Sequence, residues 1–229
     1  MQTLIFDLDD TLLDFKGGEV ADIKELVQKH AQLSGDALEE ALSTYQAINS
    51  NLWYQYEMKT IERDTIFKER FPKTLAELKL ADQVDAKQME ADYAYLRDHN
   101  YRMLDGAKEL LQNLHGRYRI LAGTNGQEET QLRRLKETGL MPYFDQIFTS
   151  EGLGVAKPDA LFFEKIFASR PDVDKENTIM IGDGLYSDML GGQNAGIETI
   201  WLNLTQKELP ESIHPNRIAH SLQELSEMF

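Results

Sequence analysis

Acidic side chains follow two apolar runs of this chain, at positions where a metal-dependent reaction can use them. Asp7 and Asp9 come directly after the run 4–6, and Asp183 follows the run 178–181. If both runs are strands of one parallel sheet, their carboxyl ends lie at the same edge and bring these carboxylates together. Clustered carboxylates repel one another and lose solvation, and a Mg²⁺ ion bound to their oxygens offsets both costs. The pattern therefore predicts a Mg²⁺-dependent phosphoryl-transfer site.

The two acids of the first motif suit different tasks. One carboxylate can attack phosphorus and form an aspartyl-phosphate. The other can protonate the leaving oxygen and later activate a water molecule. On Asp7 and Asp9 alone, a pair of solvated acids at a strand end is equally consistent with the sequence.

Two further motifs supply groups that can bind phosphate. Thr124-Asn125-Gly126 follows the apolar run 118–122 and offers a hydroxyl, an amide and backbone N–H groups, although an ordinary strand-to-helix turn is the alternative. Lys157 precedes a proline at the predicted start of a helix, where its charge can neutralise the transferred group. Asp188, five residues after Asp183, is interpreted as a second metal ligand or an orienter of Lys157, with a helix N-cap as the alternative.

Strand and helix patterns alternate in two parts of the chain, residues 1–14 and 104–229. Short β-rich runs are expected at 3–6, 118–122, 146–149, 178–181 and 198–202, with amphipathic patterns between them. This alternation predicts right-handed crossovers and a doubly wound, parallel α/β core of Rossmann-like type. Residues 15–103 lack the alternation and carry apolar residues at helical spacing. They predict an all-helical domain inserted after the first strand.

Composition narrows the class of protein further. The chain has 229 residues, no cysteine and a net charge of −15. The missing cysteines exclude disulfides and thiol nucleophiles, and the acidic balance argues against a nucleic-acid partner. No apolar run approaches the roughly 20 residues that span a bilayer, and the first residues lack the features of a signal peptide. A cytoplasmic enzyme that is a monomer or a weak homodimer, with no membrane partner, is expected.

Taken in order, the four motifs resemble the signatures of the haloacid dehalogenase superfamily over nearly the whole chain. The resemblance implies that Asp7 is the nucleophile, that Asp9 is the general acid and base, and that Thr124 and Lys157 bind phosphate. It also implies a Mg²⁺ ion held by Asp7, Asp183 and the backbone carbonyl of Asp9. The helical insertion is similar to the C1-type cap of this superfamily.

Finer features resemble the bacterial pyrimidine 5′-nucleotidases of the superfamily. They are the stretch 187–196, the segment Trp201-Leu202-Asn203, and Asn51-Leu52-Trp53 in the insertion. This resemblance implies a nucleoside monophosphate as the substrate. Asn51, Trp53 and Tyr56 place amide and aromatic surface within six residues and are predicted to recognise the leaving group, with packing inside the insertion as the alternative.

Other reactions share parts of this pattern. Superfamily members that hydrolyse sugar phosphates, or that isomerise phosphosugars, carry all four motifs, so the substrate stays open at this point. A haloacid dehalogenase needs neither the second acid nor a metal, and the full acidic set counts against it. A phospho-accepting receiver domain is about half this length and has no insertion.

Overall fold

The computed structural model describes residues 1–229. The chain divides into two compact units. The first contains Met1–Phe15 and Tyr101–Phe229, and the second contains Lys16–Asn100.

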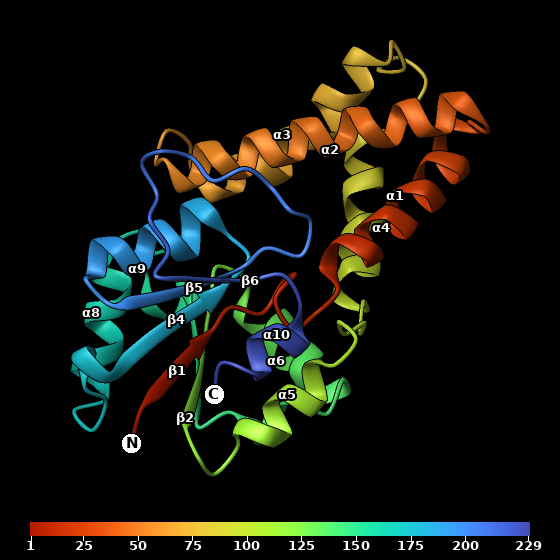
Figure 1. Cartoon of the computed structure of the whole chain (residues 1–229). Helices are drawn as coiled ribbons and strands as arrows, with labels where there is room; N and C mark the ends of the chain where they lie inside the picture. The colour runs from red at the N-terminus through yellow and green to blue at the C-terminus, as the bar shows by residue number, and fades with distance from the viewer. The chain divides into compact units, whose positions relative to one another are not determined.

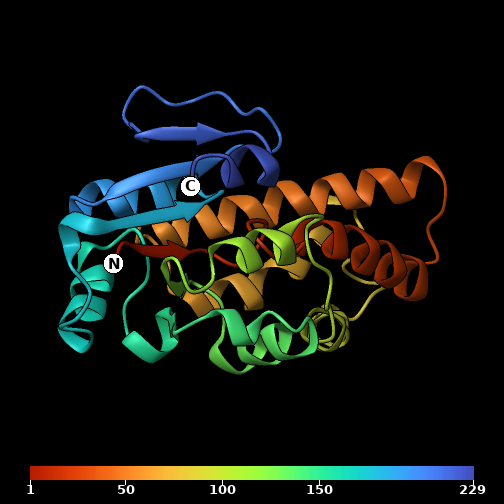
Figure 2. The same cartoon turned by 60° about the horizontal axis from the view of Figure 1, so that its bottom comes forward.

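One parallel sheet of six strands forms the centre of the first unit, in the order β3-β2-β1-β4-β5-β6 (Figure 1). All neighbouring strands pair in parallel, and the arrows of β1, β4 and β6 can be followed from a second direction (Figure 2). The strands are β1 (Thr3–Phe6), β2 (Arg119–Thr124), β3 (Gln146–Thr149), β4 (Thr178–Gly182), β5 (Glu198–Leu202) and β6 (Arg217–Ala219). Phe6 of β1 is in register with Ala122 of β2 and with Ile181 of β4. The carboxyl ends of β2, β1 and β4 are therefore neighbours, and the predicted parallel α/β core is confirmed.

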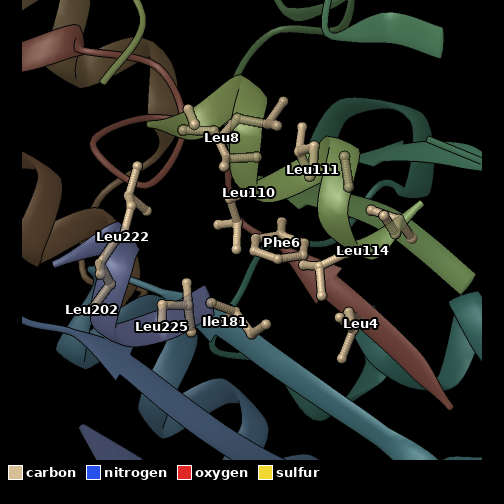
Figure 3. Packing of buried hydrophobic residues seen from close by; sticks show 14 of the residues in the cluster. Leu4, Phe6, Leu8, Leu110, Leu111, Leu114, Ile181, Leu202, Leu222 and Leu225 are labelled. Atoms are coloured by element: carbon tan, nitrogen blue, oxygen red, sulfur yellow. The ribbon is translucent and has the colours of Figure 1, made fainter. Parts of the chain in front are cut away.

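Helices cover both faces of this sheet because alternate strand residues are apolar on both sides. Leu4 and Phe6 belong to one cluster with residues of α5 (Ala107–Leu114), α6 (Glu128–Glu137) and α10 (Leu222–Ser226). The close view shows the α5 and α10 residues of this cluster around Phe6 (Figure 3). Ile5 belongs to the opposite cluster, which contains residues of α8 (Ala160–Ser169) and α9 (Leu190–Ala195). The shorter turns are α7 (Ser150–Leu153) and the 3₁₀ turns Met141–Tyr143 and Lys175–Asn177.

The structure differs from the sequence prediction near the last strands. β6 was not predicted, because a strand of three residues is too short for a periodic signal; it pairs with β5, with Ala219 opposite Leu202. The helix expected to begin near Asp188 begins at Leu190, and the preceding residues Leu185–Met189 form a π-helical turn. Such turns are frequent at functional sites.

The second unit is built from helices. They are α1, which begins in the first unit (Phe15–Ala31), α2 (Asp36–Glu57), α3 (Arg63–Glu77) and α4 (Ala86–Asp98). Three buried rings join α2, α3 and α4: Tyr45 stacks on Phe71 at 5.2 Å between ring centroids, and both meet Tyr93 edge-on. The described elements of this unit are all helices, and each buries an apolar face in one shared cluster. None of the helices in either unit combines the length and the apolarity needed to cross a membrane.

Candidate active site

The predicted site residues of the first unit lie at the carboxyl ends of adjacent strands. Asp7 follows β1, Thr124 is the last residue of β2, and Asp183 follows β4. Backbone groups hold these loops together: the N–H of Asp7 donates to the carbonyl of Ile181 at 2.8 Å, and the N–H of Asp183 donates to Thr11 Oγ1 at 3.1 Å. In an open parallel sheet this edge is where ligands bind.

Lys157 joins the separate motifs through its buried ammonium group. Its Nζ donates to Asp7 Oδ1 at 2.8 Å, to Asp188 Oδ1 at 2.6 Å and to the carbonyl of Gly123 at 2.5 Å. Burial favours the neutral amine, but the charges of Asp188 and Asp7 outweigh it and raise the pKa of Lys157 above its usual range. The lysine is therefore a fixed cation with all three donors in use.

Asn125 holds the backbone of Lys157 from both sides. The Asn125 amide nitrogen donates to the Lys157 carbonyl at 2.9 Å, and the Lys157 N–H donates to Asn125 Oδ1 at 3.0 Å. This pair of bonds ties the turn after β2 to the turn before α8. The observed contacts of the Asn125 side chain thus position Lys157, and its predicted contact with phosphate stays a prediction.

Thr124 also has defined partners. Its Oγ1 accepts the N–H of Gly126 at 3.0 Å and the side-chain amide of Gln131 at 3.1 Å. The hydroxyl is buried with these donors, which leaves its own proton available to an acceptor such as a phosphate oxygen.

The carboxylates of Asp7, Asp183 and Asp188 form one acidic cluster, in which one oxygen of each lies within 4.8 Å of the others. Burial and the neighbouring carboxylates raise the pKa of Asp7 well above its usual range, although Lys157 acts in the opposite direction. Burial likewise raises the pKa of Asp188. Lys157 supplies one positive charge against three carboxylates, so the cluster has an excess of negative charge that folding alone does not favour.

A hard divalent cation fits this donor set, because it takes carboxylate oxygens and would offset the excess charge. Asp7 and Asp183 are the residues placed to hold it. Both oxygens of Asp188 already accept protein donors, Lys157 Nζ and the N–H of Gly184 at 2.9 Å. Asp188 therefore orients Lys157, and of the two roles predicted for it this one has direct contacts in the structure.

Asp9 lies beside partners that the sequence analysis did not identify. Its Oδ2 accepts the side-chain amide of Gln131 at 2.6 Å, and its Oδ1 pairs with the guanidinium of Arg134. Gln131 and Arg134 are three residues apart on α6, and each is only 1% exposed. The sequence did carry one signal for these partners: a glutamine and an arginine lie on the same helix face as the apolar Leu135, which is buried.

The structure places the three predicted leaving-group residues on α2, in the second unit. Trp53 is half-buried and meets the rings of Tyr56 and Phe67 edge-on, at 5.9 and 6.3 Å between centroids. Asn51 is exposed and accepts a hydrogen bond from Gln55. The two rings thus have packing partners within their own unit, and recognition of a leaving group by these residues stays a prediction.

Comparisons with family models, with known sequences and with solved structures all indicate the same family. The model of the haloacid dehalogenase-like hydrolases matches residues 1–196. The chain is 37% identical to the pyrimidine 5′-nucleotidase PynA of Streptococcus pneumoniae, over 97% of this chain and 92% of that protein. It is 32% identical to the pyrimidine 5′-nucleotidase YjjG of Escherichia coli, over 98% and 96% of the two chains. A magnesium-bound crystal structure of the HAD-hydrolase YfnB from Bacillus subtilis superposes with a TM-score of 0.89 at 33% identity, covering 99% of this chain and 97% of that one.

Proposed function

The chain belongs to the haloacid dehalogenase-like hydrolases, and we propose that it is a Mg²⁺-dependent 5′-nucleotidase that hydrolyses pyrimidine nucleoside monophosphates through an aspartyl-phosphate on Asp7. The observation that carries this proposal is the buried Asp7 carboxylate, held at 2.8 Å by Lys157 beside two further acids. Two relatives at 32% and 37% identity that are named pyrimidine 5′-nucleotidases support the choice of substrate.

The proposed reaction has two steps. In the first, a carboxylate oxygen of Asp7 attacks phosphorus, the bond from phosphorus to the 5′ oxygen breaks, and the carboxyl proton of Asp9 passes to that oxygen. In the second, water attacks phosphorus, Asp9 takes the water proton, and the bond from Asp7 to phosphorus breaks to release inorganic phosphate. Mg²⁺, when bound, supplies positive charge that offsets the phosphate oxygens and the acidic cluster.

The fixed residues around Asp7 have separate tasks in this scheme. Lys157 keeps the nucleophile in place and stabilises the charge that develops on the phosphoryl oxygens. Thr124 and the turn that follows β2 bind those oxygens. Asp183 completes the metal site, and Asp188 keeps Lys157 aimed at Asp7. The second acid separates this site from that of a haloacid dehalogenase, for which Asp9 would have no task.

A substrate panel tests the proposal. The purified protein is assayed for inorganic phosphate release from pyrimidine and purine nucleoside monophosphates, sugar phosphates and p-nitrophenyl phosphate, with Mg²⁺ or with EDTA. The expected result is the highest kcat/KM for pyrimidine nucleotides and no turnover in EDTA. A higher kcat/KM for sugar phosphates would replace the substrate assignment, and transfer of phosphate within a sugar without release would indicate a mutase.

Replacing Asp183 by alanine should abolish Mg²⁺ binding together with activity, because it removes an oxygen ligand from the cation that offsets the cluster. Mg²⁺ should raise the melting temperature of the wild type, since a ligand of the folded state stabilises it, and should leave the Asp183→Ala variant unchanged. The measurement is thermal unfolding across a Mg²⁺ titration. A Mg²⁺-dependent rise in the variant that matches the wild type would exclude Asp183 as a ligand.

We also propose that Trp53, with Asn51 and Tyr56, selects the nucleoside. Stacking of an aromatic face on a base is worth about 1–3 kcal/mol by alanine substitution. Trp53→Ala should therefore lower kcat/KM for a pyrimidine nucleotide by roughly that free energy, while kcat/KM for p-nitrophenyl phosphate and the melting temperature change little. Equal losses on both substrates, or a large drop in melting temperature, would show that Trp53 acts only by packing against Tyr56 and Phe67.

A further inference from the structure

The carboxylate of Asp9 is held by two side chains of α6. Arg134 Nη1 pairs with Oδ1, and Gln131 Nε2 donates to Oδ2 at 2.6 Å. The two holders also contact each other, because Arg134 Nη1 donates to Gln131 Oε1 at 3.3 Å. Gln131 Nε2 further reaches Thr124 Oγ1 at 3.1 Å. One helix face therefore links the predicted acid of the first motif to the predicted phosphate ligand of the second.

Burial of these groups is asymmetric. The side chain of Arg134 is 1% exposed, whereas that of Asp9 is 30% exposed. The guanidinium also lies 5.6 Å from the ring centroid of Phe15. Burying an arginine costs free energy of desolvation unless its charge is well paired and hydrogen-bonded. Replacing a buried ion pair by apolar side chains often leaves the free energy of unfolding unchanged. Stability alone thus gives a weak reason for this arrangement, in which the Asp9 side chain keeps part of its surface exposed.

We propose that Arg134 and Gln131 are positioning residues that hold the Asp9 carboxyl in the orientation needed for proton transfer, an inference that rests on the proposed phosphatase function. Proton transfer requires the two heavy atoms to lie within about 2.6–3.2 Å, so a freely rotating Asp9 would spend most of its time out of reach. Neither holder touches the substrate or the nucleophile in this scheme. Both act through Asp9.

The two Asp9 oxygens are not equivalent in this arrangement. Oδ1 faces the Arg134 cation, and Oδ2 faces the neutral Gln131 amide. Each oxygen therefore has its own donor, one charged and one neutral. The two holders together fix both oxygens of Asp9, and with them the orientation of its carboxyl group.

The test uses two leaving groups that differ in their need for a proton. Departure of a nucleoside 5′ oxygen requires protonation, whereas departure of 2,4-dinitrophenolate does not. The value of kcat/KM depends only on the steps up to the first irreversible one, which here is departure of the leaving group. It is therefore independent of the later attack of water. Arg134→Met should lower kcat/KM for the nucleotide by about 10²–10³-fold, within the range of general acid catalysis, and lower kcat/KM for 2,4-dinitrophenyl phosphate by less than about tenfold.

Gln131→Leu and Arg134→Lys extend the test if Arg134→Met does not fold. Lysine keeps the charge but has no planar fork of donors, so a partial recovery of nucleotide hydrolysis is expected. Arg133→Met is the matched control: it is the neighbouring arginine on α6, pairs with Glu129 at 2.6 Å on the surface, and should leave both substrates unaffected.

A double-mutant cycle decides between positioning and general damage. In an Asp9→Asn background, Arg134→Met should cost almost nothing more on the nucleotide, because residues that act through one another are not additive. Equal losses on the two substrates, or full additivity with Asp9→Asn, would overturn the inference. If the wild type shows no Asp7-dependent hydrolysis of either substrate, the proposed function is wrong. If the wild type hydrolyses both substrates and only Asp9→Asn shows the leaving-group effect, the proposed function stands and the role of Arg134 is wrong.

Discussion

Replacing Asp7 by asparagine is expected to abolish turnover while the protein stays folded. The amide is nearly the same size as the carboxylate but cannot attack phosphorus. When catalytic residues act as a unit, removing the nucleophile typically lowers kcat by at least about 10⁴-fold. Lys157 keeps Asp188 as its partner at 2.6 Å, so the buried cation is not left alone. The measurement is kcat on a pyrimidine nucleotide, together with the melting temperature in EDTA.

The stability of this variant is as informative as its activity. Burial and neighbouring acids raise the pKa of Asp7 well above its usual range. An acid whose pKa is higher in the folded than in the unfolded state destabilises the fold once the pH is high enough to ionise it. In EDTA at neutral pH, Asp7→Asn should therefore unfold at the same temperature as the wild type or at a higher one. A lower melting temperature of Asp7→Asn than of the wild type would mean that the Asp7 carboxylate stabilises the folded state.

Asp10→Asn is the matched control for this experiment. Asp10 lies in the same loop with a positive φ of 60°, a conformation that asparagine adopts as readily as aspartate. It is not one of the three acids of the cluster. We expect kcat close to that of the wild type. Hydrolysis by Asp7→Asn at a comparable rate would rule out Asp7 as the nucleophile.

The second large effect is expected for Lys157→Met. Its ammonium group is the buried positive charge that contacts Asp7 and Asp188. Breaking a buried ion pair by removing one partner typically costs about 3–5 kcal/mol, because the remaining charges lose their compensation. Activity should fall as well, by about 10²–10³-fold in kcat, since a fixed positive charge near the developing negative charge is lost. Urea unfolding in EDTA and steady-state kinetics measure the two effects separately.

The double variant Lys157→Met/Asp188→Asn separates the structural from the catalytic contribution of Lys157. Removing the charge of Asp188 as well should restore part of the lost free energy of unfolding, because fewer buried carboxylates remain unpaired. Activity should not recover, because the transferred phosphoryl group still lacks its cation. If Lys157→Met only raises KM at unchanged kcat, the lysine binds substrate and transition state equally and has no special role in catalysis.

Much of the core of the site follows from the sequence because a parallel sheet places strand ends side by side. The apolar runs 3–6 and 178–181 locate two strands whose carboxyl ends carry Asp7 and Asp183 at one edge of the sheet, and the structure makes these strands neighbours. Lys157 was also expected at the site, from its position before a predicted helix and from the family resemblance. Its three contacts depend on the path of the turn between β3 and α8, for which local sequence carries no signal.

What the sequence could not predict are contacts between distant side chains. Gln131 and Arg134 lie on an ordinary amphipathic pattern, and their meeting with Asp9 depends on how α6 packs on the sheet. The π-helical turn that carries Asp188 has no periodic signature either. Recognition of the nucleoside by Asn51, Trp53 and Tyr56, the cytoplasmic location and the oligomeric state stay predictions.

Isolation of the phosphoenzyme tests the central claim most directly. The Asp9→Asn variant lacks the base that activates water, so it should accumulate the covalent intermediate when mixed with Mg²⁺ and ³²P-labelled 2,4-dinitrophenyl phosphate, whose leaving group needs no proton. After a rapid acid quench and proteolysis, we expect the label on the peptide that contains Asp7, lost on treatment with hydroxylamine as an acyl phosphate should be. Turnover by the wild type without any label on that peptide, or a label on another residue, would contradict the account.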